Sequence, residues 1–302
     1  MTALVTVVGD LMLDVSEEGA VHRVSPEAPV LILHNPVARY ALGGAANTAA
    51  NVKALGAEVR LFGAVGADEP GERSRKLAAE AGIDARFIEI NGYRTTVKRR
   101  FLAGGQQMLR VDVEDGQLPA ASSDGLVAAA VAAVAGEAVV LSDYDKGLIS
   151  AELATAVIAA ARANGARIVV DTKRLDLACL RGSTVLAPNH HEAARITGES
   201  DPLRAAQRIA ELTGGSAVLV TLGADGMLLL EDGVATHIAS NAREVADVTG
   251  AGDTVTAGLA VALAEGLPLL AAARWANAAA AEAVSHYGTY AVPRSSIGDP
   301  QL

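Results

Sequence analysis

Residues 247–254 of the chain read Asp-Val-Thr-Gly-Ala-Gly-Asp-Thr, and an apolar, alanine-rich stretch follows them directly. Three small residues before a predicted helix leave successive backbone N–H groups uncovered, and the helix dipole adds partial positive charge there. A loop of this kind can bind an anion. It is not a Walker A loop, because the chain contains no G-x-x-x-x-G-K-[ST] sequence. It is not a dinucleotide fingerprint either, because Gly250-Ala251-Gly252 lacks the third glycine.

Asp253, the acid at the end of this loop, has two interpretations. It could be an ordinary cap or first-turn acid of the helix. A carboxylate beside a bound phosphate would repel it, however, unless the carboxylate takes a proton from an attacking hydroxyl group, as phosphoryl transfer requires. We therefore predict that Asp253 is a general base and that Gly250, Ala251 and Gly252 form an anion hole.

Outward from this loop, short β-branched runs alternate with alanine-rich segments over most of the chain. This alternation predicts an α/β fold with a doubly wound, mostly parallel sheet. The predicted strands cover residues 4–8, 59–62, 138–141, 167–170, 184–186 and 217–221, with a hairpin of 227–230 and 235–238. The predicted helices cover residues 45–55, 71–81, 124–135, 151–163, 202–212, 253–264 and 269–285.

Two segments, about 14–40 and 86–113, break this rhythm, because alternating apolar and polar residues there predict strands without intervening helices. Such strands form either a small lid outside the main sheet or edge strands of that sheet. No repeat, linker or charge block marks a domain boundary. We expect a single domain of residues 1–302 with a small β-strand lid.

Composition excludes several classes of function. With 25 Lys and Arg against 35 Asp and Glu, the formal charge is −10, which disfavours a nucleic-acid partner. No run of 18 apolar residues and no signal peptide is found, so we expect no membrane partner and a cytoplasmic location. The single cysteine, Cys179, excludes an intrachain disulfide and fits a reducing compartment.

Two further groups of residues favour a sugar ligand. Gly43-Gly44-Ala45-Ala46-Asn47 starts a predicted helix, where bare backbone permits close approach and the Asn47 amide can bind hydroxyl groups. A plain tight turn before a helix is the alternative. Asp14 follows the first strand, where α/β sheets bind ligands, and its carboxylate could bind two sugar hydroxyls. Asp10 is predicted to support the local turn.

The segment Pro188-Asn189-His190-His191-Glu192 follows a predicted strand. Asn189 and Glu192, three residues apart on a first helical turn, face the same way and suit water-mediated Mg²⁺ binding beside nucleotide phosphates. The paired histidines are predicted to be packing or solvated residues, because the chain has no H-E-x-x-H pattern for zinc.

In this order, these pieces resemble the ribokinase/PfkB-type sugar kinase family over almost the whole chain, with family motifs at 43–68 and 247–253. Residues 9–14, 25–30, 106–112 and 142–147 are similar to the branch that acts on heptose 7-phosphates. The resemblance implies a carbohydrate kinase with ATP and Mg²⁺, leaves a monovalent cation requirement open, and suggests a homodimer through the lid strands. The chain has no His-x-Gly-His motif, so we expect no nucleotidyltransferase step.

The resemblance also implies individual roles. Asp253 would be the base, Gly250, Ala251 and Gly252 the anion hole, and Asn189 and Glu192 would order Mg²⁺. The sugar would be held by Asp14, Gly43, Gly44 and Asn47, and the nucleotide by Lys173, Asn189, Thr221, Gly223, Gly226 and Asn277. Lys173 lies in Asp-Thr-Lys-Arg, where heptose kinases carry Asp-Pro-Lys-Gly, so this loop departs from the family pattern at Thr172 and Arg174.

A sugar that already carries a phosphate needs cations at its far end. We assign Lys98, Arg110 and Lys146 to this role. The expected reaction is ATP-dependent phosphorylation of the anomeric hydroxyl of D-glycero-β-D-manno-heptose 7-phosphate to the 1,7-bisphosphate. The alternatives are another sugar kinase of the family, acting on fructose, ribose or a nucleoside, and a non-catalytic sugar or nucleotide sensor.

Overall fold

The structure is a computed structural model that describes residues 2–118, 123–242 and 244–300. Nine strands form the main sheet in the order β13-β12-β11-β10-β9-β8-β1-β4-β5, and all neighbours are parallel except β11-β12 and β12-β13. The strands are β1 (Leu4–Gly9), β4 (Glu58–Gly66), β5 (Asp84–Ile90), β8 (Ala138–Asp143), β9 (Arg167–Thr172), β10 (Val185–Leu186), β11 (Ala217–Thr221), β12 (Met227–Glu231) and β13 (Val234–Ile238). The predicted α/β fold with a mostly parallel sheet is confirmed.

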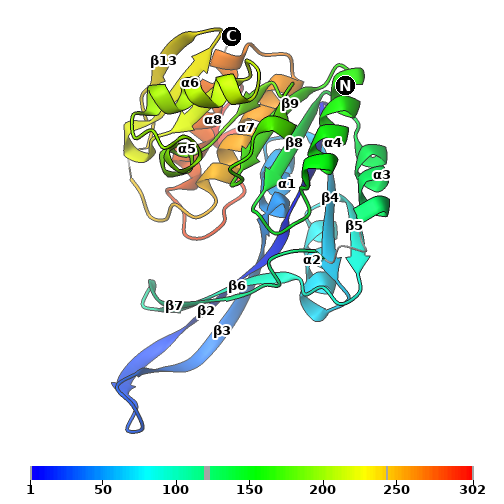
Figure 1. The fold of residues 1–302 in the computed structure, drawn as a ribbon. Helices are drawn as coiled ribbons and strands as arrows, with labels where there is room; N and C mark the ends of the chain where they lie inside the picture. The colour runs from blue at the N-terminus through cyan, green and yellow to red at the C-terminus, as the bar shows by residue number, and fades with distance from the viewer. Residues whose placement is uncertain (1, 119–122, 243, 301–302) are drawn as a thin grey trace.

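Helices cover both faces of this sheet (Figure 1). Neighbouring residues of β1 serve opposite faces, because Val7 packs in one apolar cluster and Val8 in the other. Helices α1, α2, α7 and α8 contribute to the first cluster, and α3, α4, α5 and α6 to the second. The bounds are α1 (Ala45–Ala54), α2 (Glu69–Glu80), α3 (Ser123–Ala133), α4 (Ala151–Ala163), α5 (His190–Thr197), α6 (Pro202–Leu212), α7 (Ala251–Ala264), α8 (Leu269–Ala283) and α9 (Arg294–Ile297). Among the described residues, no helix is both long and apolar enough to cross a bilayer.

A second sheet of four strands has the order β3-β2-β6-β7. Its strands are β2 (Leu11–Val24), β3 (Leu31–Gly44), β6 (Thr96–Ala103) and β7 (Gln106–Val113). Figure 1 shows the hairpin of β2 and β3 as a long arm that projects from the body. Near the body, Leu13, Val15 and Val97 pack against Leu77 of α2. We call these four strands the lid sheet; its closing function stays a prediction.

One predicted boundary of the lid is wrong. Residues 86–90 belong to β5, which pairs in parallel with β4 at the edge of the main sheet. Phe87 and Ile90 are buried in the clusters on the two faces of that sheet, which is the apolar pattern of a covered strand. The second lid segment therefore begins at β6.

Helix α7 begins at Ala251, two residues before the predicted start. Gly250 precedes it in the left-handed region, with φ of 79°, a conformation that glycine adopts without steric cost. Ala251 and Gly252 therefore lie inside the first helical turn, and Asp253 is the third residue of the helix.

Candidate active site

The carboxylate of Asp253 is buried at the N-terminus of α7, with 4% of the residue exposed. Its Oδ1 accepts hydrogen bonds from the Tyr144 hydroxyl at 2.6 Å and from Thr48 Oγ1 at 3.1 Å. Its Oδ2 accepts one from Asn47 Nδ2 at 2.7 Å. Burial raises the pKa of Asp253, and the bonds from Tyr144, Asn47 and Thr48 oppose that rise.

The turn at the start of α7 offers backbone donors beside this carboxylate. Within the described part of the chain, the N–H groups of Gly250, Gly252 and Asp253 have no partner, whereas the N–H of Ala251 donates to Val248 O at 3.3 Å. A Cβ at position 250 would lie 2.7 Å from Asn47 Nδ2. The glycine therefore lets the turn lie against α1, and the unpaired N–H groups give it the chemistry of an anion hole.

Asp10 supports the neighbouring loop, as predicted. Its carboxylate accepts hydrogen bonds from the backbone N–H groups of Tyr144, Lys146 and Leu148 at 2.8, 3.0 and 3.2 Å. Burial raises the pKa of Asp10 to about 6, although these three bonds lower it. The loop after β8 is thus fixed to the end of β1, and with it the tyrosine that contacts Asp253.

Replacing Asp10 with asparagine should destabilise the fold by about 1–3 kcal/mol at pH 5, because the amide places N–H groups against backbone donors. The folded state binds the proton of Asp10 more tightly than the unfolded state, so wild-type stability falls as pH rises through about 6. The asparagine variant lacks this contribution. Its deficit in unfolding free energy should therefore shrink by about 1 kcal/mol between pH 5 and 7.5, measured by urea unfolding. A deficit that does not change with pH would contradict this assignment.

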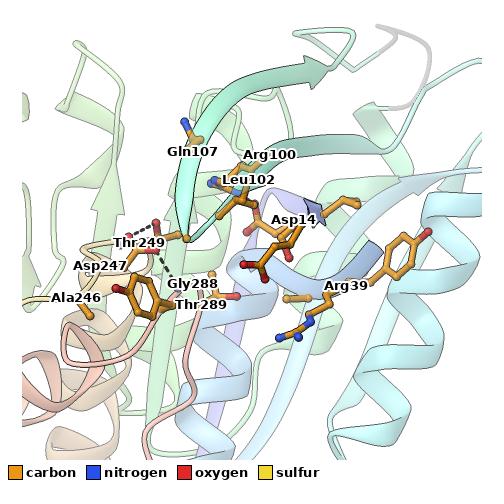
Figure 2. Close-up of a pocket in the computed structure, with 17 residues that line it drawn as sticks. Asp14, Arg39, Arg100, Leu102, Gln107, Ala246, Asp247, Thr249, Gly288 and Thr289 are labelled. Carbon is orange, nitrogen blue, oxygen red and sulfur yellow. Dashed lines mark hydrogen bonds and ion pairs between the residues drawn. The ribbon is translucent and has the colours of Figure 1, made fainter. Parts of the chain in front are cut away.

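A cavity of about 400 Å³ lies between the lid sheet and the loops beside α7. Figure 2 shows lid residues such as Asp14, Arg100 and Gln107 on one side, and Asp247, Thr249 and Gly288 on the other. Asp14 Oδ1 accepts a hydrogen bond from Arg100 at 2.5 Å. This cavity adjoins the start of α7 through Thr249 and has the polar lining that a sugar needs.

Gly43 and Gly44, which do not line this cavity, let the end of β3 pack closely against β2 and the residue before it. A Cβ at Gly43 would lie 2.5 Å from Asp14 Oδ2, and one at Gly44 would lie 2.6 Å from Asp10 O. Gly44 also has φ of 59° before α1. Asn47, predicted to bind the sugar, donates its amide N–H to the carboxylate of Asp253.

The three predicted cations do not line this cavity. Arg110 pairs with Asp112 at 2.5 Å, and Lys146 pairs with Glu114 at 2.8 Å. Lys98 Nζ lies 5.3 Å from the ring centroid of Tyr144. The basic residues among those that line the cavity are Arg39 and Arg100. A role for the three predicted cations at the distal phosphate stays a prediction. The alternation of residues along β6 could not reveal that Arg39 lines the cavity, because Arg39 lies on another strand, β3.

Two further cavities continue from Asp253 along the main sheet. The first, about 180 Å³, holds Lys173, Asn189 and Thr221 beside Asp253, and the second, about 330 Å³, shares Thr221. The second cavity is mostly apolar, which suits the aromatic ring of a nucleotide. It is lined by the remaining predicted nucleotide residues, Gly223, Gly226 and Asn277, and by Val245, Val248, Val255 and Val284. Asn277 Nδ2 donates a hydrogen bond to Ala239 O at 2.7 Å, and no described residue donates one to Asn277 Oδ1.

Asn189 and Glu192 form a capping box at the start of α5. Asn189 Oδ1 accepts from Glu192 N at 2.9 Å, and Glu192 Oε2 accepts from Asn189 N at 3.0 Å. The side-chain oxygen of Asn189 is therefore engaged in the cap. Asp171, which lines the same cavity and was not predicted, is 9% exposed. Burial, with the negative charges of Glu192 and Asp253, raises its pKa well above the usual value.

Sequence reasoning also missed Tyr144 and Thr48, which contact Asp253. Tyr144 and Asp171 both lie at the carboxyl end of a parallel strand: Tyr144 directly follows β8, and Asp171 is near the end of β9. Ligands bind at that edge of an α/β sheet, so this position was an available signal. The same rule had been applied to Asp10 and Asp14.

The sequence model described as "pfkB family carbohydrate kinase" matches residues 2–295. The chain belongs to this family. A D-beta-D-heptose 7-phosphate kinase of Bordetella bronchiseptica is 43% identical over 300 residues, which are 98% of this chain and 95% of that relative. A bifunctional protein HldE of Azorhizobium caulinodans is 44% identical over 304 residues, 98% of this chain, which spans 64% of the length of that relative.

Solved structures agree on the fold of this family member. An Arabidopsis thaliana ribokinase, complexed with ribose and ATP, is 26% identical with a TM-score of 0.75 over 98% of each chain. Phosphofructokinase-2 from Escherichia coli, in complex with potassium, is 22% identical with a TM-score of 0.81 over 98% of this chain and 96% of that one. These findings confirm the predicted family and the ribokinase-like fold class.

Proposed function

We propose that this pfkB-family protein transfers the γ-phosphoryl group of ATP to the anomeric hydroxyl of D-glycero-β-D-manno-heptose 7-phosphate. One observation carries the proposal: the buried carboxylate of Asp253 lies at the start of α7, between the cavity lined by Asp14 and the cavities that continue to Asn277. A base there meets a hydroxyl group from one side and a phosphoryl group from the other. The 43% identical relative described as a heptose 7-phosphate kinase supports the sugar class.

In this proposal each residue acts through a group that the structure describes. Asp253 accepts the proton of the sugar hydroxyl as its oxygen bonds to the γ-phosphorus and the bond from that phosphorus to the bridging oxygen of ADP breaks. Asp14 accepts hydrogen bonds from other sugar hydroxyls. The N–H groups of Gly250 and Gly252 hold the transferred group, and Lys173 in the same cavity balances its charge. The lid sheet would then exclude water and limit hydrolysis of ATP.

Mg²⁺, which the family implies, would neutralise the charge of the nucleotide phosphates. Glu192 and Asp171 fit this ion, because both place carboxylate oxygens, its preferred ligands, in the cavity that contains Asp253. No group of three or more His, Cys, Asp or Glu among the described residues could hold a metal by itself. Water and phosphate oxygens would therefore complete the coordination. The requirement for a monovalent cation stays a prediction.

A panel of sugars in an ADP-release assay tests the substrate class. Heptose 7-phosphate should be phosphorylated with a kcat/KM about 10- to 100-fold above that of the same heptose without phosphate, since a charge-assisted hydrogen bond contributes about 1.5–3 kcal/mol. Sedoheptulose 7-phosphate, fructose 6-phosphate, fructose and ribose complete the panel. Equal activity on an unphosphorylated sugar would favour another kinase of the family. Tight nucleotide binding without ADP production from any sugar would favour a sensor.

We also propose a homodimer formed through the lid sheet. Leu109, Val111 and Val113 of β7 are 56%, 39% and 38% exposed. They lie opposite Phe101, Arg99 and Val97 of β6, and Val97 packs toward α2 while Arg99 pairs with Glu17. An apolar face that continues beyond the body supports a protein contact there. The cytoplasmic location stays a prediction.

A further inference from the structure

The hydroxyl group of Tyr144 lies 2.6 Å from Asp253 Oδ1, the length of a charge-assisted O–H···O⁻ bond. Burial raises the pKa of Tyr144 well above its usual value, and the negative charges of Asp253 and Asp171 raise it further. The hydroxyl group therefore stays protonated near neutral pH. It is the donor in this bond, and the carboxylate is the acceptor.

The two oxygens of Asp253 differ in their capacity to accept another proton. Each carboxylate oxygen offers two acceptor positions. Oδ1 receives two donors, Tyr144 and Thr48, whereas Oδ2 receives one, Asn47. Among the described residues, no other side chain donates to either oxygen. One acceptor position is left, and it lies on Oδ2.

We propose that Tyr144 is a positioning residue for the general base: its hydroxyl group fills Oδ1 of Asp253 and leaves Oδ2 to take the proton of the sugar hydroxyl. This inference rests on the proposed kinase function. Asn47 then fixes the plane of the carboxylate from the other side. The base presents a single oxygen in a single orientation to the sugar, which lowers the entropic part of the barrier.

Tyr144 is itself held from several sides. Its backbone N–H donates to Asp10. Its ring lies 5.3 Å from Lys98 Nζ and 4.2 Å from Lys173 Nζ, within the range of cation–π contacts. Lys98 belongs to β6 of the lid sheet and Lys173 follows β9. A ring held by the lid and by the main sheet keeps its hydroxyl group on the base.

The hydrogen bond from Tyr144 also lowers the pKa of Asp253. Removing the Tyr144 hydroxyl removes a donor that lowers the pKa of Asp253, so that pKa should rise. The other charged groups around the site are acids on β2, β9 and α5 and lysines on β6 and after β9: Asp14, Asp171, Glu192, Lys98 and Lys173. A Tyr144→Phe change leaves all of them in place, so the shift would report the lost bond.

The test measures kcat against pH for Tyr144→Phe and for the wild type, and then repeats the change in an Asp253→Asn background. We expect kcat about 10-fold lower, with the acid limb of its profile at a pH about one unit higher, and similar KM values for sugar and ATP. In the Asp253→Asn background the same change should cause no further loss, because Tyr144 acts through that carboxylate.

Tyr290→Phe is the matched control, since this tyrosine stacks on His286 and makes no described contact with Asp253. An unchanged profile with wild-type kcat, or an equal fold loss in both backgrounds, would overturn the proposal. Full activity of Asp253→Asn alone would overturn the kinase mechanism instead. If Tyr144→Phe does not fold, NMR titration of ¹³C-tyrosine answers the question: Asp253→Asn should lower the pKa of Tyr144, and an unaltered pKa would contradict the contact.

Discussion

Replacing Asp253 with asparagine should lower kcat by roughly 10²- to 10⁴-fold, the contribution of a positioned general base. The amide has nearly the same shape but cannot accept the proton of the sugar hydroxyl. KM for ATP should change little, because the N–H groups at the start of α7 and the apolar cavity beyond Thr221 are left intact. An ADP-release assay with heptose 7-phosphate at saturating substrates measures the effect.

The same variant should not lose stability. Burial raises the pKa of Asp253, which means that folding disfavours its charged form. A neutral amide avoids that penalty, and the donor that its N–H group meets is the Asn47 side chain, which can turn, unlike the backbone donors around Asp10. The melting temperature should therefore stay close to the wild-type value. Near-normal turnover in a folded Asp253→Asn protein would remove the residue from its catalytic role.

Replacing Asp14 with asparagine should lower kcat/KM for the sugar by about 100-fold, while KM for ATP stays unchanged. Two charge-assisted hydrogen bonds to sugar hydroxyls weaken, each worth about 1.5–3 kcal/mol. The partner of Asp14, Arg100, also loses its counter-ion at 2.5 Å in a half-buried position. Steady-state kinetics with each substrate varied in turn separates the two KM values.

Glu17→Gln provides the matched control for this change. Glu17 lies on the same strand as Asp14 and pairs with Arg99 at 2.5 Å, yet it does not line the cavity of about 400 Å³ that Asp14 lines. The Glu17→Gln change removes a carboxylate–arginine ion pair of the same kind from the lid sheet. A similar loss of kcat/KM in both variants would mean that Asp14 acts through the stability of the lid and not through the sugar.

Several features at the start of α7 could be predicted from the local sequence. The Gly-Ala-Gly-Asp segment predicted a helix N-terminus with an anion site and a base, and the structure places a buried carboxylate beside unpaired N–H groups there. The start of the helix was misplaced by two residues, because small residues do not reveal whether they precede the first turn or form it. Residues 86–90 were misassigned for a similar reason, since an edge strand and a lid strand share the same alternation.

The local sequence could not predict which basic residues line the cavity. Lys98, Arg110 and Lys146 satisfied the requirement for positive charge, but pairing with Asp112 and Glu114 engages two of them, and Lys98 lies beside Tyr144. A charge in a sequence carries no information about which acid will reach it. That depends on which strands become neighbours.

The amino-acid sequence alone determined the family and the α/β architecture and predicted Asp253 as the base, because each depends on residue types within one short segment or on their period along the chain. Only the tertiary structure decided what surrounds that base. Tyr144 and Asp253 are 109 positions apart, and Arg100 and Asp14 are 86 apart. Such pairs form only when distant elements pack together, and the packing then sets the orientation, the burial and the acidity of each side chain.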